Sequence, residues 1–68
     1  MNNFAKNLAA LMQENGVSQI ALAKVLKVKQ QTISRYIKGD REPDIDIIIE
    51  IAQFFDVTVG QLLGVEEY

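Results

Sequence analysis

The sequence predicts an all-α fold in which five short helices form one compact domain over residues 1–68. Apolar residues recur at helical spacing in separate stretches, and glycine or polar residues stand where each stretch ends. The chain has only 68 residues. A chain of this size buries only about 60% of the surface that its unfolded form exposes, so a second domain would lack a core.

The first helix is expected over about residues 3–15. Its apolar residues at helical spacing are Phe4, Leu8, Leu11 and Met12. Gly16 follows them, and glycine is common just after the last residue of a helix.

The second helix is expected to follow almost at once. Ser18 is a good N-cap residue, and the helix should end near Lys27. Its apolar residues are Ile20, Leu22, Ala23, Val25 and Leu26. Val28 comes next and is expected to anchor the turn in the core.

The third helix is expected from about Gln30 to Lys38. Ile33, Tyr36 and Ile37 mark its apolar face. Gly39 and the polar loop of residues 40–43, which contains a proline, should end it.

Residues 44–55 fit two patterns. Isoleucines alternate along the segment as they would in a strand, at positions 45, 47, 49 and 51. The helical period extends further, through Ile45, Ile48, Ile49, Ala52 and Phe55. Asp44 after Pro43 is a suitable N-cap, so we expect a fourth helix.

A last short helix is expected at about residues 59–63. Thr58 and Gln61 have the spacing of a capping box ahead of Leu62 and Leu63, and Gly64 should end the helix. The two leucines fit a core position and an interface equally well.

The composition disfavours several functional classes. The chain has no cysteine and no histidine, so it lacks the usual zinc ligands and a histidine acid or base. We therefore expect no enzymatic activity, no cofactor and no metal. The chain has neither a signal-peptide pattern nor an apolar run long enough to span a bilayer, so we expect no membrane partner and a cytoplasmic location.

Charge is distributed unevenly along the chain. The net charge of −2 by itself disfavours a nucleic-acid partner. However, residues 24–38 carry five basic and no acidic residues, whereas residues 40–68 carry eight acidic residues and only one basic residue, Arg41. Charge alone leaves two readings open, a nucleic-acid surface and an ordinary solvated face.

The order and spacing of the motifs resemble the Cro/C1-type helix-turn-helix family of phage repressors and bacterial regulators. The resemblance covers nearly the whole chain and rests on Ser18-Gln19, Leu22-Ala23, Leu26 with Val28, Ile33 and Gly39, followed by Pro43, an apolar helix and Val57-Thr58 before Leu62-Leu63. It implies a compact lambda-repressor-like fold of five helices. Its second and third helices would form a helix-turn-helix at about residues 18–38, and the third would enter the major groove of DNA.

Candidate DNA contacts follow from this resemblance and from side-chain chemistry. Glutamine can both donate to and accept from adenine, so Gln30 and Gln31 are the leading base-reading residues. Without the resemblance, they would be read as ordinary solvated residues. The other candidates for base contacts are Ser34 and Arg35, and those for phosphate contacts are Gln19, Lys29, Thr32 and Lys38. Arg35 could also reach a phosphate.

The chain departs from the family pattern in several places. Acidic residues stand at positions 40, 42, 44 and 46, a region that contributes phosphate contacts in many relatives, and their charge disfavours such contacts here. Lys27 stands where glycine is common, and we expect it to have a positive φ angle. Lys29 replaces the usual serine or threonine cap. Both lysines add positive charge near the expected DNA face, so we expect them to favour DNA affinity over local stability. Met12 and Ile37 stand where many relatives bury an arginine and a glutamate as an ion pair, so we expect these two side chains to touch in the core.

Two functions remain open at this point. The first is a sequence-specific regulator, a repressor in preference to an activator, that binds double-stranded DNA as a homodimer on a two-fold operator. The second is a protein-interaction module of the same fold, such as an antitoxin or an antirepressor-type partner. The acidic second half of the chain favours this alternative.

Overall fold

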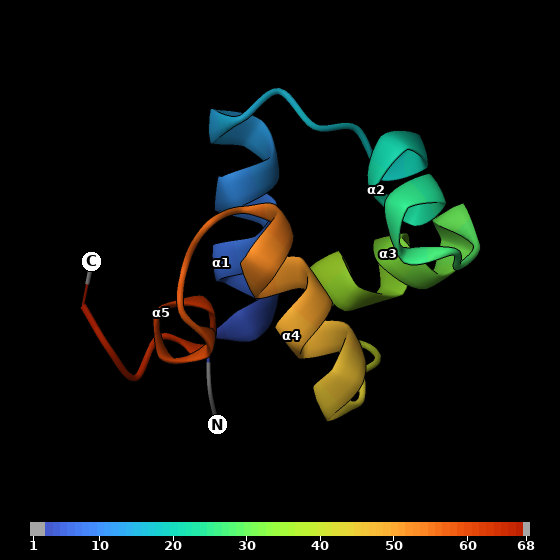
Figure 1. Cartoon of the computed structure of the whole chain (residues 1–68). Helices are drawn as coiled ribbons and strands as arrows, with labels where there is room; N and C mark the ends of the chain where they lie inside the picture. The colour runs from blue at the N-terminus through green and yellow to red at the C-terminus, as the bar shows by residue number, and fades with distance from the viewer. Residues whose placement is uncertain (1–2, 68) are drawn as a thin grey trace.

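The computed structural model describes residues 3–67, and this part of the chain folds into helices without a strand. The helices are α1 (Phe4–Glu14), α2 (Gln19–Leu26), α3 (Gln30–Lys38), α4 (Ile45–Phe54) and α5 (Val59–Leu63). The all-α prediction is confirmed, and the strand alternative for residues 44–55 is excluded. Figure 1 shows α2 and α3 on the side of the molecule opposite α5.

Side-chain caps start three of the helices as the sequence predicts. The Ser18 hydroxyl caps α2, and the Asp44 carboxylate caps α4 by accepting a 3.0 Å hydrogen bond from the Ile47 N–H. Thr58 and Gln61 form the expected capping box at α5, in which the Thr58 hydroxyl accepts from the Gln61 N–H at 3.0 Å and the Gln61 side chain accepts from the Thr58 N–H at 2.9 Å. Local hydrogen bonds therefore set where these helices begin.

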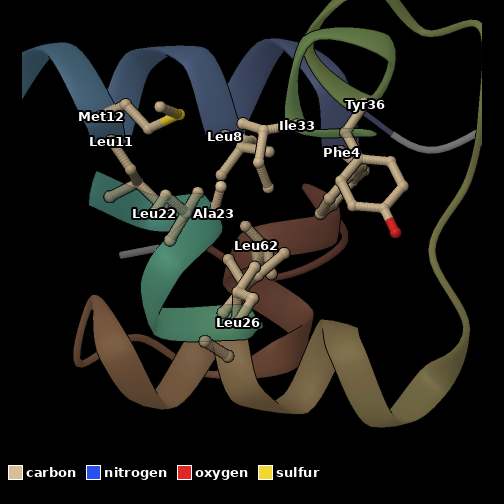
Figure 2. Packing of buried hydrophobic residues seen from close by; sticks show 12 residues of the cluster. Phe4, Leu8, Leu11, Met12, Leu22, Ala23, Leu26, Ile33, Tyr36 and Leu62 are labelled. Atoms are coloured by element: carbon tan, nitrogen blue, oxygen red, sulfur yellow. The ribbon is translucent and has the colours of Figure 1, made fainter. Parts of the chain in front are cut away.

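The core lies between the helices and is apolar. Its buried hydrophobic residues are Phe4, Leu8, Leu11, Met12, Leu22, Ala23, Leu26, Ile33, Tyr36, Ile51, Ala52 and Leu62. Figure 2 shows Ile33 beside Leu8, and Tyr36 beside Phe4. The rings of Phe4 and Tyr36 meet edge to face with their centroids 6.2 Å apart, which fastens the start of α1 to α3.

The buried face of α4 differs in part from the face that the helical period indicated, since Ile48 and Phe55 pack against the core as expected. Ala52 is buried, but Ile45 is 60% exposed and Ile49 is 38% exposed, while Ile51 is fully buried. Apolar residues surround this helix, so their spacing alone does not select an inward face. Contacts with α2 and α5 select it in the folded chain. On α2, Ile20 and Val25 are likewise exposed.

The N-cap of α4 allows a direct test of the contribution of capping. We expect Asp44→Ala to destabilise the fold by about 1 kcal/mol, because the Ile47 N–H then loses its acceptor. This loss corresponds to a melting temperature lower by about 4–8 °C for a domain of this size. Asp44→Asn should keep most of the stability, since asparagine caps almost equally well. Equal melting temperatures for Asp44→Ala and the wild type would contradict the assignment.

Candidate nucleic-acid interface

Helix α3 is held with one face inward and the opposite face in solvent. Ile33 is fully buried and Tyr36 is 3% exposed, and the helix packs against α1 and α2. Gln30, Gln31 and Arg35 are exposed on the other face. An α-helix anchored along one side in this way can place its free side in the major groove of DNA, which is about 12 Å wide.

The turn between α2 and α3 is short and closely packed. Lys27 has a φ angle of 57°, the left-handed conformation expected from the sequence. The Val28 N–H donates to the Ala23 carbonyl at 3.0 Å, and Val28 packs against the core. Ala23 is buried, and its small side chain allows α2 and α3 to approach closely. The turn thereby sets the direction in which α3 leaves α2.

The N-terminus of α3 carries no side-chain cap. Lys29 occupies the N-cap position with extended backbone and makes no capping hydrogen bond, as the sequence predicts. Its carbonyl accepts from Thr32 and Ile33, whereas the first amides of a helix, here those of Gln30 and Gln31, have no intrahelical acceptor. The positive end of the helix dipole therefore adds to the lysine charge at this end of the face.

The basic side chains of residues 24–38 are free to meet an anion. All five of them are exposed, and they are Lys24, Lys27, Lys29, Arg35 and Lys38. Within residues 3–67, none of the five forms an ion pair. The acidic residues that follow α3 in the chain are exposed as well, at positions 40, 42, 44 and 46. The exposed charges of residues 24–38 are therefore all positive, and those of residues 40–46 are mainly negative.

The fold brings most of the expected contact residues together. Gln30, Ser34 and Lys38 succeed one another at four-residue spacing, and Gln31 and Arg35 form the adjacent row, so all five share the outer face of α3. We call this surface the α3 face. Ser34 is half-buried, and the other four side chains are exposed.

The three remaining candidates flank the α3 face. Lys29 adjoins its N-terminal end. Thr32 lies on the flank of α3 and is half-buried. Gln19 is the first residue of α2 and is also half-buried, next to the Ser18 cap. Lys27, the other lysine of this turn, also stands exposed at this end of α3.

Residues 3–67 contain neither a candidate metal cluster nor a candidate membrane-spanning helix. Within residues 3–67, no group of three or more acidic side chains is arranged to hold a metal ion. No helix in this part of the chain has the length and apolarity that crossing a membrane requires.

Known proteins share both the sequence pattern and the fold. A family model described as helix-turn-helix matches residues 8–62. The chain is 28% identical over 65 residues to the HTH-type transcriptional regulator ImmR of Bacillus subtilis (strain 168), an alignment that covers 96% of this chain and 51% of that protein. A transcriptional regulator from Listeria innocua, known from a crystal structure, superposes on it with a TM-score of 0.93 at 31% identity, covering all of this chain and 64% of the other.

These matches extend over both the helix-turn-helix and the helices that support it. The chain spans about half the length of the Bacillus protein and 64% of the Listeria structure, so the similarity concerns this domain of those regulators. From the family match over residues 8–62, together with the five-helix fold, the chain belongs to the Cro/C1-type helix-turn-helix family of DNA-binding regulators.

Proposed function

We propose that this chain binds double-stranded DNA at a specific sequence and regulates transcription, acting as a repressor. The observation that carries this proposal is the α3 face, where two exposed glutamines begin a helix that is anchored along its opposite side by Ile33 and Tyr36. Such a helix can enter the major groove without rearrangement of the core. The similarity to two transcriptional regulators supports the same role.

The side chains of the α3 face suit the reading of bases. Gln30 and Gln31 lie at the end of α3 that approaches the base edges in helix-turn-helix proteins, and a glutamine amide pairs with N6 and N7 of adenine. Ser34 and Arg35 follow about one turn later. Arg35 is exposed and without an ion pair within residues 3–67, so it is available for O6 and N7 of guanine.

The flanking residues suit the DNA backbone. Lys29 and Lys38 stand near opposite ends of α3 and carry positive charges that can pair with phosphates. Gln19 begins α2, where the helix N-terminus favours a phosphate. Thr32 offers a hydroxyl on the flank of α3. These four residues would position the helix, and the α3 face would read the sequence.

A homodimer on a two-fold operator accounts for specificity. One helix of this length reads only a few base pairs, and two copies placed about 34–36 Å apart read two half-sites one helical turn apart. A dimer seated on such a site would block transcription from a promoter that overlaps it. Such a protein acts in the cytoplasm of a bacterial cell, where the DNA lies.

The alternative is a protein-interaction module of the same fold. The exposed acidic residues after α3, in the loop and at the start of α4, favour it, because carboxylates at positions 40, 42, 44 and 46 repel phosphates. If this alternative holds, the chain folds but does not select a DNA sequence.

Selection from a randomised duplex library tests the two functions. The purified chain at about 0.1 M salt should enrich a two-fold-symmetric site. The Gln30→Ala/Gln31→Ala variant should lose this enrichment and bind the selected duplex more weakly by roughly 30-fold or more, because each lost bidentate contact is worth about 1–3 kcal/mol.

The same variant should remain folded, since both glutamines are exposed. Its circular dichroism spectrum and melting temperature provide the control. No enrichment by the folded wild-type chain would contradict the proposed function and favour the interaction module.

A further inference from the structure

The helices of this chain end in the same backbone geometry. Each of the five described helices is followed by a residue in the left-handed region, and these residues are Gly16, Lys27, Gly39, Asp56 and Gly64. In each case the next residue donates its N–H to the carbonyl five positions earlier, at 2.8–3.0 Å. This arrangement is the Schellman motif, in which glycine is favoured because it has no Cβ atom to clash.

Lysine at this position is the exception. Three of the five positions have glycine, and the fourth has aspartate, which tolerates the left-handed conformation better than most side chains. Only the turn before α3 uses a long cationic residue, Lys27, with a φ angle of 57°. The turn before α5 is its counterpart, since Asp56 also has a φ angle of 57° and a valine follows in both.

The N-cap position, two residues after the left-handed residue, also differs between the turn before α3 and the turns before α2 and α5. Two residues after the left-handed position, Ser18 and Thr58 begin α2 and α5 with a side-chain cap. Lys29 occupies the equivalent place before α3 and makes no cap. The chain therefore forgoes a favourable C-terminal glycine and a favourable N-cap at the same turn, and both substitutions introduce a positive charge.

Within the described part of the chain, the side chains of Lys27 and Lys29 make no polar contact that would stabilise the fold. Both side chains are exposed, and within residues 3–67 neither forms an ion pair or a side-chain hydrogen bond. Val28 between them packs against the core and fixes the turn, so its two neighbours extend from a rigid support. Figure 1 places this turn on the side of the molecule away from α5.

We infer that Lys27 and Lys29 together form a clamp for the phosphate backbone of duplex DNA, at the N-terminal end of the α3 face. This inference rests on the proposed function and adds Lys27 to its contacts. The two lysines flank an anchored valine in the sequence, and the uncapped amides of Gln30 and Gln31 follow directly, so positive charges and free backbone donors occur together at this turn. The clamp contributes affinity for DNA of any sequence, and the α3 face contributes selectivity.

Salt dependence of binding tests the clamp. We would measure the affinity of the 68-residue chain for the selected duplex and for a mixed-sequence duplex between about 50 and 200 mM salt. Lys27→Gly should reduce the slope of log K against log salt by about 0.9, and it should weaken binding to both duplexes by the same factor. Lys29→Ser should have the same two effects. The double variant should show a slope of log K against log salt that is reduced by about 1.8. Lys27→Arg should keep the wild-type slope.

Thermal melting separates lost contacts from lost structure. Lys29→Ser should raise the melting temperature by about 4–8 °C through a new cap. Lys27→Gly should leave it unchanged or raise it, because relief of the left-handed strain opposes the greater freedom of glycine in the unfolded chain. Asp56→Gly is the matched control, since it changes the same backbone position in the turn before α5 and should leave the salt slope at the wild-type value.

The outcomes distinguish the clamp from the proposed function. If the wild type binds its selected duplex and Lys27→Gly binds with an unchanged slope, the clamp is wrong and the proposed function stands. If the folded wild type binds neither duplex, the proposed function is wrong and the clamp falls with it. A slope that drops in Asp56→Gly as much as in Lys27→Gly would also overturn the clamp.

Discussion

Ile33→Ala is expected to remove about 2–5 kcal/mol of folding free energy, the cost of truncating a buried isoleucine. Ile33 is fully buried on the inner side of α3, the helix that packs against α1 and α2. A domain of 68 residues has a total stability of about 3–10 kcal/mol. Chemical denaturation should therefore show the variant to be partly or largely unfolded, with DNA binding reduced in proportion to its folded fraction.

Ile20→Ala is the matched control for this change. Ile20 is also a helical isoleucine, but it is 53% exposed on α2. Its truncation should cost far less, because the side chain remains largely in water in the folded state. If Ile33→Ala and Ile20→Ala unfold at the same denaturant concentration, the assignment of Ile33 to the buried face of α3 is wrong.

Met12→Arg is expected to destabilise the chain by about 3–5 kcal/mol, because it leaves an unpaired charge in the core. Met12 is 6% exposed on α1, and Ile37 of α3 is a partly buried residue packed against the core. The resemblance places an arginine and a glutamate at these two positions in many relatives. Denaturation of the single variant measures the cost of the charge alone.

The double variant Met12→Arg/Ile37→Glu tests whether the two side chains touch. If they do, the second substitution supplies a partner for the guanidinium and restores part of the lost stability, with a coupling of about 0.5–3 kcal/mol in a double-mutant cycle. Ile37→Glu alone provides the third corner of the cycle. Strictly additive losses would contradict the predicted contact.

Helix ends were predictable because they depend on local chemistry. Ser18, Asp44 and Thr58 cap the helices that they were expected to cap, since a cap requires only a short polar side chain within the same turn of chain. The left-handed conformation of Lys27 was expected from the family resemblance, because glycine is common at this turn position in the family.

The inward face of α4 was not predictable in the same way. Isoleucines occur around the whole helix, and the burial of Ile51 against the exposure of Ile45 arises from where α2 and α5 lie. Tyr36 shows the same dependence, because its edge-to-face contact joins it to Phe4, a residue far away in the sequence. Packing between distant segments decides which of these side chains are buried, and the apolar periodicity within one segment does not predict that packing.

Some features of the candidate interface likewise follow from the sequence, and others depend on tertiary packing. The sequence by itself determined the family resemblance, the cationic stretch and the glutamines at the start of α3, because these follow from residue type and spacing. Only the tertiary structure decided that Gln30, Gln31 and Arg35 face solvent together, and that Gln19 and Thr32 lie half-buried beside them. The physical reason is that α1 and α2 bury Ile33 and Tyr36, and this burial fixes the rotation of α3 about its own axis.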